Sequence, residues 1–183
     1  ILCEDCEKEF SLLDDYGAKV LLVQRHLVEI KDPDSQEILA YRVEGAEIDF
    51  DKLRRVFLSI AYRAHLSSVK FFQKINLGPD EKIFFNIIFK GVTDNSLCIF
   101  LQYVSSDELE KIAKNSLLDP HLTRIDGINF LKFYLGSGFV LYVKVDKRPA
   151  PDPFNLLSLG VQSRIFMIAG DFTKEIDLLK KII

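Results

Sequence analysis

Residues 49–64 read Asp49-Phe50-Asp51-Lys52-Leu53-Arg54-Arg55-Val56-Phe57-Leu58-Ser59-Ile60-Ala61-Tyr62-Arg63-Ala64, which is the clearest structural pattern in the chain. The apolar side chains recur at the spacing of one helix face, at Phe50, Leu53, Phe57, Ile60, Ala61 and Ala64. An aspartate at position 49 or 51 is a favourable start for a helix. The pattern therefore predicts an amphipathic helix that buries one face in a core.

A second, polar stripe of the same helix carries Asp51, Arg55, Ser59, Tyr62 and Arg63. Guanidinium groups suit phosphate oxygens and a tyrosine ring can stack on a base, so Arg55, Arg63 and Tyr62 are candidate nucleic-acid contacts. The alternative is a structural ion-pair face, in which Asp51 pairs with Arg55 one turn later. The spacing is compatible with both interpretations.

Outward from this helix, periodicity predicts a mixture of helices and hairpins. Further helices are predicted over residues 11–26, 80–91, 106–117 and 173–183, with a shorter one from Ser67 through Phe71-Phe72. Strands are predicted over residues 27–30, 38–43, 97–104, 128–135, 139–145 and 164–169. The capping pair Ser11 and Asp14 sets the start of the first helix. Residues 83–89 would suit a buried strand equally well, and we favour the helix because Pro79-Asp80-Glu81 resembles a helix start.

The chain is long and apolar enough to build a core without crosslinks. It has 183 residues, of which 48% are hydrophobic, with 15 Phe and no Trp. We expect an α+β fold, with helices packed on antiparallel β-hairpins, in a single compact domain over residues 11–183. Residues 147–153 form a Pro-rich internal connector, because only 30 residues follow it.

Charge, cysteine content and hydropathy argue against a globally basic nucleic-acid-binding protein, a disulfide framework and a membrane span. The net charge is −3, so contact with DNA or RNA would need a local basic patch. Three cysteines, only two of them close in sequence, argue against a disulfide framework and for a reducing compartment, the cytoplasm. No apolar run approaches the ~18 residues of a membrane span. The many phenylalanines leave a protein partner or a homo-oligomer open.

Cys3 and Cys6 form half of a zinc knuckle, the turn in which two thiolates grip one Zn²⁺. We assign residues 1–10 to this half knuckle. The other candidate ligands, Cys98, His26, His65 and His121, do not stand at a spacing that would complete the site. A pair of reduced thiols without metal is the alternative. The first residue is Ile, and an unfinished metal motif beside it favours a fragment that lacks its N-terminal segment.

Several short motifs resemble those of bacterial HNH-like zinc-binding proteins. The first motif is Leu2-Cys3-x-x-Cys6-Glu7, followed by Phe10-Ser11 and Asp14-Asp15-Tyr16. The second is residues 57–63, where relatives tend to have Leu-Ser-x-x-Trp-Arg. Residues 75–79 and the stretch Val145-Asp146-Lys147-Arg148 are also similar. The resemblance implies that Cys3 and Cys6 are the second knuckle of a structural zinc site. It also implies descent from ββα-metal nucleases, in which a His activates water and a divalent cation, Mg²⁺ or Mn²⁺, steadies the scissile phosphate.

The sequence departs from the active pattern of that family at Glu7, which stands where many HNH nucleases carry a His after the second cysteine. A carboxylate can bind Mg²⁺, so Glu7 is the candidate catalytic residue that the resemblance implies. No H-E-x-x-H, G-x-S-x-G or P-loop motif occurs. The resemblance therefore implies the C-terminal portion of an HNH-like zinc-binding protein that acts on nucleic acid. It implies a metal-dependent DNA endonuclease in bacterial defence if the missing N-terminal segment carries the catalytic His. The alternative is a non-catalytic binding or scaffold module with a structural zinc site.

Overall fold

The helix predicted over residues 49–64 is α2 (Phe50–Leu66), and it lies at the centre of the core. Asp49 caps it, with Oδ1 accepting a hydrogen bond from the backbone N–H of Lys52 at 2.9 Å. Phe57 and Leu53 are completely buried, and α2 contacts α1, α3 and the sheet. The computed structural model describes residues 3–23, 26–44, 47–94, 97–104, 118–161 and 165–169.

The described strands form one sheet of seven, in the order β1-β2-β7-β3-β6-β5-β4. Their bounds are β1 His26–Lys31, β2 Ile38–Glu44, β3 Ile99–Tyr103, β4 His121–Ile125, β5 Ile128–Gly136, β6 Phe139–Lys144 and β7 Phe166–Ala169. Every pair is antiparallel except β3 with β7. The predicted α+β class is confirmed.

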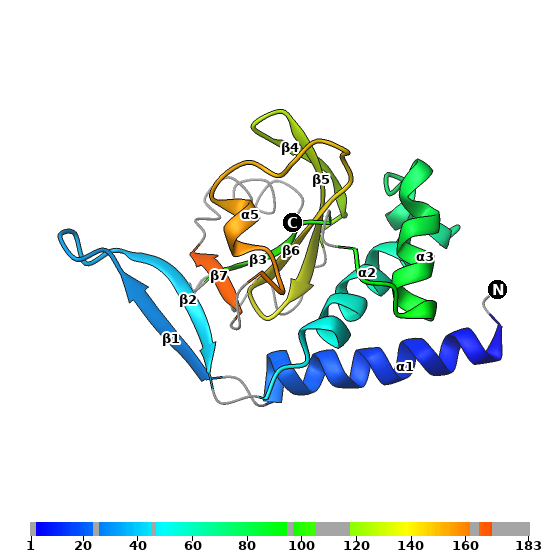
Figure 1. Ribbon diagram of the computed structural model, residues 1–183, viewed down its shortest axis with the longest axis horizontal. Helices are drawn as coiled ribbons and strands as arrows, with labels where there is room; N and C mark the ends of the chain where they lie inside the picture. Colours follow the sequence, from blue (N-terminus) through cyan, green and yellow to red (C-terminus); the bar gives the residue numbers. More distant parts are fainter. Residues whose placement is uncertain are drawn as a thin grey trace.

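The sheet buries both of its faces. Leu101 and Leu141 point toward α2 in the larger cluster, whereas Phe100 and Phe130 belong to a second cluster on the opposite face. There Phe154 of the short helix α5 (Phe154–Leu157) packs on Phe100, with ring centroids 4.8 Å apart. The connector over residues 147–153 leads into α5 and so returns the chain to the sheet (Figure 1).

The first helix begins earlier than predicted, because α1 spans Glu4–Ala18 and continues as a π-helical turn over Lys19–Val23. Its N-cap is Cys3, and Glu4, Asp5 and Glu7 stand in the first turn, where the helix dipole favours negative charge. The start predicted at residue 11 was therefore wrong. The cysteines lie on the first helical turn instead of a separate knuckle, and α1 crosses the boundary that we had placed after residue 10.

Most of the remaining predicted elements are confirmed. The β1–β2 hairpin pairs Leu27 with Val43, and α3 (Glu81–Lys90) resolves the ambiguity over residues 80–91 in favour of a helix. The short helix predicted from Ser67 is a 3₁₀ turn over Lys70–Phe72. At the β5–β6 turn, a Cβ on Gly138 would lie 2.6 Å from the Val104 carbonyl oxygen, so the close backbone approach requires glycine there.

One strand was missed, and two predicted helices cannot be compared. β4 is a half-exposed edge strand of alternating burial that follows Asp119-Pro120, and we had predicted no element there. The helices predicted over residues 106–117 and 173–183 lie outside the described residues. No helix in the described ranges is long and apolar enough to cross a membrane.

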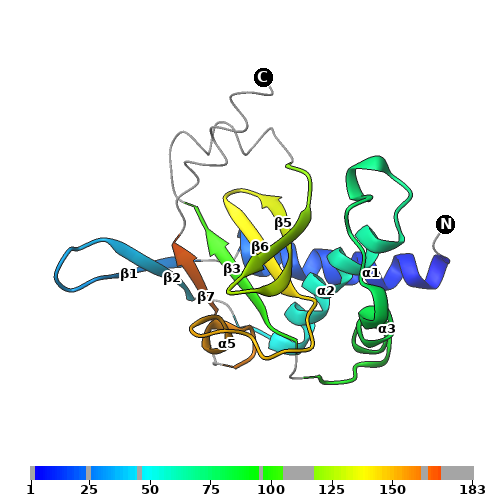
Figure 2. The ribbon, with the colours of Figure 1, turned by 90° about the horizontal axis from the view of Figure 1, so that it is seen from above.

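The two ends of the molecule carry different features. Both views show the N-terminal turn of α1 at one end of the long axis and the β1–β2 hairpin projecting at the other (Figures 1 and 2). The sheet, α2 and α3 lie between them. The cysteine pair therefore lies at an outer tip of the molecule.

Candidate functional site

The cysteine pair occupies the first turn of α1. Cys3 is in an extended conformation (φ −75°, ψ 158°), and its Sγ accepts a hydrogen bond from the backbone N–H of Cys6 at 3.3 Å. The two Sγ atoms lie 2.9 Å apart. Cys3 is exposed and Cys6 is partly exposed, so both thiols can be reached from solvent. Helical geometry brings the two sulfurs together because residues three apart share one helix face.

The two thiols have unequal acidities. The hydrogen bond between the sulfurs and the one from the Cys6 backbone lower the pKa of Cys3, against the charge of Asp5, which raises it. The same sulfur–sulfur hydrogen bond raises the pKa of Cys6, with further contributions from burial and the charge of Cys3. The contact between the sulfurs therefore shifts the pKa values of the two thiols in opposite directions.

The cysteine pair offers two candidate metal ligands, and the described residues do not complete a metal centre around it. In the part of the chain that the structure describes, no group of three or more His, Cys, Asp or Glu side chains is arranged to hold a metal ion. Cys98 is buried on the other face of the sheet, His65 lies 3.6 Å from Glu81, and His121 contacts the Asp119 carbonyl oxygen. Glu7, the candidate catalytic residue, is exposed in the first turn of α1.

Arg55 and Arg63 of α2 both reach across to carboxylates of α1. Arg63 makes two parallel hydrogen bonds to Asp14, at 2.8 and 2.7 Å, and its guanidinium lies 5.0 Å from the ring centroid of Phe10. Arg55 pairs with Glu9, and its Nε donates to the Ile88 carbonyl oxygen at 2.9 Å. This arrangement favours the ion-pair interpretation of the polar stripe, with α1 supplying the carboxylates in place of Asp51.

Tyr62 is surrounded by aromatic rings. It is 8% exposed, and its ring centroid lies 6.1 Å from that of Phe89 and 6.4 Å from that of Phe85. Burial raises the pKa of its hydroxyl group. A nucleobase would have to displace core side chains to stack on this ring, so the geometry assigns Tyr62 to packing between α2 and α3.

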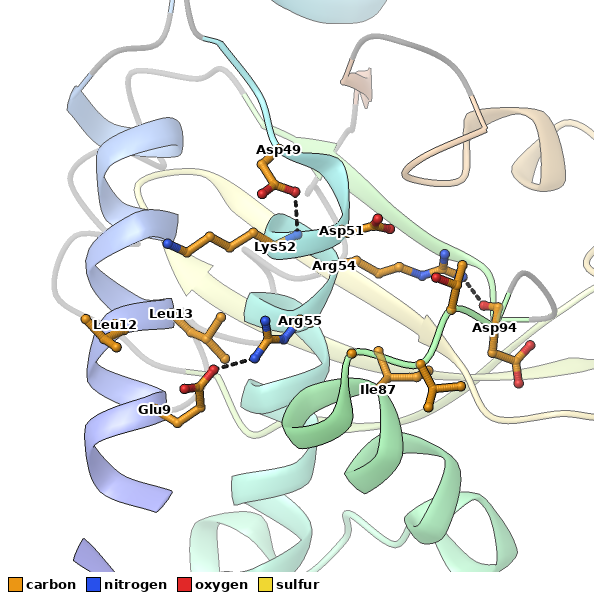
Figure 3. A pocket seen from close by; sticks show the side chains of 13 residues that line it. Glu9, Leu12, Leu13, Asp49, Asp51, Lys52, Arg54, Arg55, Ile87 and Asp94 are labelled. Carbon is orange, nitrogen blue, oxygen red and sulfur yellow. Dashed lines mark hydrogen bonds and ion pairs between the residues drawn. The ribbon is translucent and has the colours of Figure 1, made fainter. Parts of the chain in front are cut away.

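A cavity of about 290 Å³ lies where α1, the N-terminal end of α2 and the segment after α3 meet (Figure 3). Leu13 and Ile87 supply its apolar lining. Glu9 and Arg55 form an ion pair at its wall, and Arg54 donates to the carbonyl oxygens of Asp94 and Leu97. The cavity has room for a small polar molecule. Acidic and basic groups alternate around it, so its charge does not select an anion or a cation.

The acidic partners of the arginines were missed from sequence. Glu9 was not singled out, and Asp14 was interpreted as a helix-capping residue, because acidic residues are common on a solvated helix face. The signal that could have identified these partners was their position beside Phe10 and Leu13. Those two residues are buried, and they place that side of α1 against α2.

Comparison with known proteins does not extend this picture: the sequence matches no model of a known protein family, no curated protein and no solved structure. The resemblance to HNH-like proteins therefore remains a prediction, and the site must be argued from its own geometry.

Proposed function

We propose that this chain is a non-catalytic binding module in which Cys3 and Cys6 are two ligands of a structural zinc ion. The observation that supports the proposal is the pair of accessible sulfurs on one helical turn, 2.9 Å apart. Two thiolates bound to one tetrahedral zinc at 2.3 Å lie about 3.8 Å apart, so small side-chain rotations would open the pair to a metal. Zinc prefers thiolates, and the lowered pKa of Cys3 assists its ionisation.

A tetrahedral zinc ion bound by Cys3 and Cys6 has two further coordination positions. Their ligands would come from outside the described residues, from a protein partner or from a second copy of the chain. The metal would tie the exposed tip of α1 to those ligands. Reduced thiols are required, so we place the protein in the cytoplasm.

The test is zinc binding by the reduced full chain, measured by native mass spectrometry and by competition with a chromogenic chelator. We expect zinc on the unmodified chain and on the Cys98→Ser variant, as one ion per chain or one per two chains. The double variant Cys3→Ser, Cys6→Ser should lose it. Equal zinc affinity in the double variant would contradict the proposal.

The resemblance to HNH-like proteins supplies a second candidate, an endonuclease or other protein acting on nucleic acid in bacterial defence. On this proposal, Glu7 would help to hold Mg²⁺ or Mn²⁺, and Arg55, Arg63 and Tyr62 would approach the nucleic acid. In its favour stand the Cys3–Cys6 motif and Glu7 beside it on the exposed end of α1. The ion pairs of Arg55 and Arg63 and the burial of Tyr62 count against it, and we rank it second.

Two measurements separate the candidates. Plasmid DNA incubated with the chain and Mg²⁺ or Mn²⁺ should stay intact, and cleavage lost in Glu7→Gln would favour the nuclease. Binding to a labelled DNA or RNA duplex, followed by fluorescence anisotropy, should be absent. Binding that weakens steeply with salt and with Arg63→Gln would indicate a phosphate contact.

A further inference from the structure

The first turn of α1 holds its two sulfur atoms closer than zinc requires, and this geometry supports a second kind of chemistry. A disulfide has a sulfur–sulfur bond of about 2.05 Å, so the Sγ atoms of Cys3 and Cys6 need to approach by roughly 0.9 Å from their separation of 2.9 Å. Both thiols can be reached by a small molecule in solution. Cys3 and Glu4 are exposed at the end of the helix, so the Cys3 sulfur can move toward Cys6, which packs against the edge of the core.

The surroundings of the two thiols divide the roles between them. The Cys3 sulfur accepts a backbone hydrogen bond from Cys6, which holds it at the exposed N-terminal end of α1. Cys3 is the more exposed of the two cysteines, so its sulfur is the one that a disulfide in solution reaches first. Cys6 lies three residues later in the same turn and is less exposed. It is placed to attack the Cys3 sulfur once that sulfur has reacted.

We infer that Cys3 and Cys6 form a redox-active dithiol that exchanges with small aliphatic disulfides, with Cys3 as the nucleophile and Cys6 as the resolving thiol. The Cys3 thiolate attacks one sulfur of the disulfide, its S–S bond breaks, and one thiolate leaves. The product is a mixed disulfide on Cys3. Cys6 then loses its proton and attacks the Cys3 Sγ, which forms the Cys3–Cys6 bond and releases the second thiolate. In total, two protein thiols are oxidised and one disulfide is reduced to two thiols.

This activity does not require the proposed zinc site, although both use the same sulfurs. Zinc on the thiolates would block the exchange, and the Cys3–Cys6 disulfide would exclude zinc. Cys98 takes no part, because it lies in the second core cluster, on the opposite face of the sheet. Burial there raises the pKa of its thiol.

The experiment uses the reduced, metal-free full chain with oxidised glutathione at neutral pH. Remaining thiols are alkylated at timed intervals and located by peptide mass spectrometry. We expect Cys3 and Cys6 to become protected from alkylation together, in a peptide that is two hydrogens lighter than its reduced form. Cys98 should stay a free thiol. In Cys6→Ser a single glutathione should stay on Cys3, and it should form several-fold faster than the adduct on Cys6 in Cys3→Ser.

Two results would overturn the inference. One is a glutathione adduct on Cys3 of the unmodified chain that does not close to the internal disulfide. The other is equal reaction rates of Cys3 and Cys6 in the two single variants. Because the reaction is run with chelator present, failure to bind zinc in the earlier test would leave this result unchanged. Circular dichroism of each variant confirms that the fold is retained.

Discussion

The first turn of α1 and the rest of the helix differ in what they contribute. From Phe10 onward the helix is part of the core: Phe10, Leu13 and Gly17 are buried against neighbouring elements. In the first turn, Cys3, Glu4 and Asp5 are exposed. The same helix therefore stabilises the fold at one end and presents two thiols at the other. Cys6, in the same turn, is partly buried against the core, so Cys3 is the thiol that is least involved in packing.

The largest loss of stability is expected from a substitution at Phe10, in the buried part of α1. Its ring is 3% exposed and meets Phe89 edge-on, with centroids 5.4 Å apart, so Phe10→Ala should destabilise the protein by about 3–5 kcal/mol. Urea unfolding measures the change. Leu12→Ala, on a side chain that is 60% exposed, is the matched control and should shift stability by less than about 0.5 kcal/mol. Equal losses in the two variants would contradict the assignment of this part of α1 to the core.

A second effect is expected at the close contact between α1 and α2 at Gly17. A Cβ on Gly17 would lie 2.7 Å from Cγ1 of Val56, so Gly17→Ala should overpack the contact. We expect a net loss of about 1–2 kcal/mol, because overpacking outweighs the gain in helix propensity. In a Val56→Ala background the same substitution should cost less, as measured by thermal unfolding. A stabilising Gly17→Ala would show that the helices do not approach as described.

The ion pair between Arg63 and Asp14 should contribute less again. Its side chains are 31% and 47% exposed, so solvent weakens the pair despite its two hydrogen bonds. A double-mutant cycle with Arg63→Gln and Asp14→Asn should give a coupling of about 0.3–1 kcal/mol that decreases with salt. The pair of Lys8 with Glu4, at 69% and 87% exposed, serves as the control and should give almost none. Coupling absent from both pairs would remove the structural role that we assign to Arg63.

The smallest effect on stability is expected at the tip itself. Replacing Cys3 and Cys6 by Ser should change the free energy of unfolding of the metal-free reduced chain by less than about 0.5 kcal/mol. A serine hydroxyl at position 3 can still cap the helix. Calorimetric melting of the double variant measures this change. A loss of several kcal/mol would mean that the first turn is part of the core.

Sequence reasoning succeeded where one periodic signal determined an element. The stripe through Leu53 and Phe57 located α2, and the alternation around Gly138 located the β5–β6 hairpin. It failed where partners distant in sequence decide the outcome. The start of α1 depends on a cysteine acting as N-cap, an unusual choice, and the role of Arg55 and Arg63 depends on carboxylates of another helix.

The candidate site was foreseen in its residues and not in its geometry. The spacing of Cys3 and Cys6 identified a pair of thiols, but their separation and unequal acidities follow from the helical turn that carries them. The interpretation of Tyr62 as a stacking platform overlooked α3, whose rings enclose it. A stripe pattern on one helix cannot specify which neighbour covers it.

The central claim is that the first turn of α1 is a thiolate metal site formed by Cys3 and Cys6. Titration of the reduced chain with Co²⁺, followed by absorption spectroscopy, tests it most directly, because thiolate ligands give an intense charge-transfer band. We predict this band for the unmodified chain and for Cys98→Ser, and its loss in the Cys3→Ser, Cys6→Ser variant with melting behaviour unchanged. An absent band in the unmodified chain, or an equal band in the double variant, would contradict the claim.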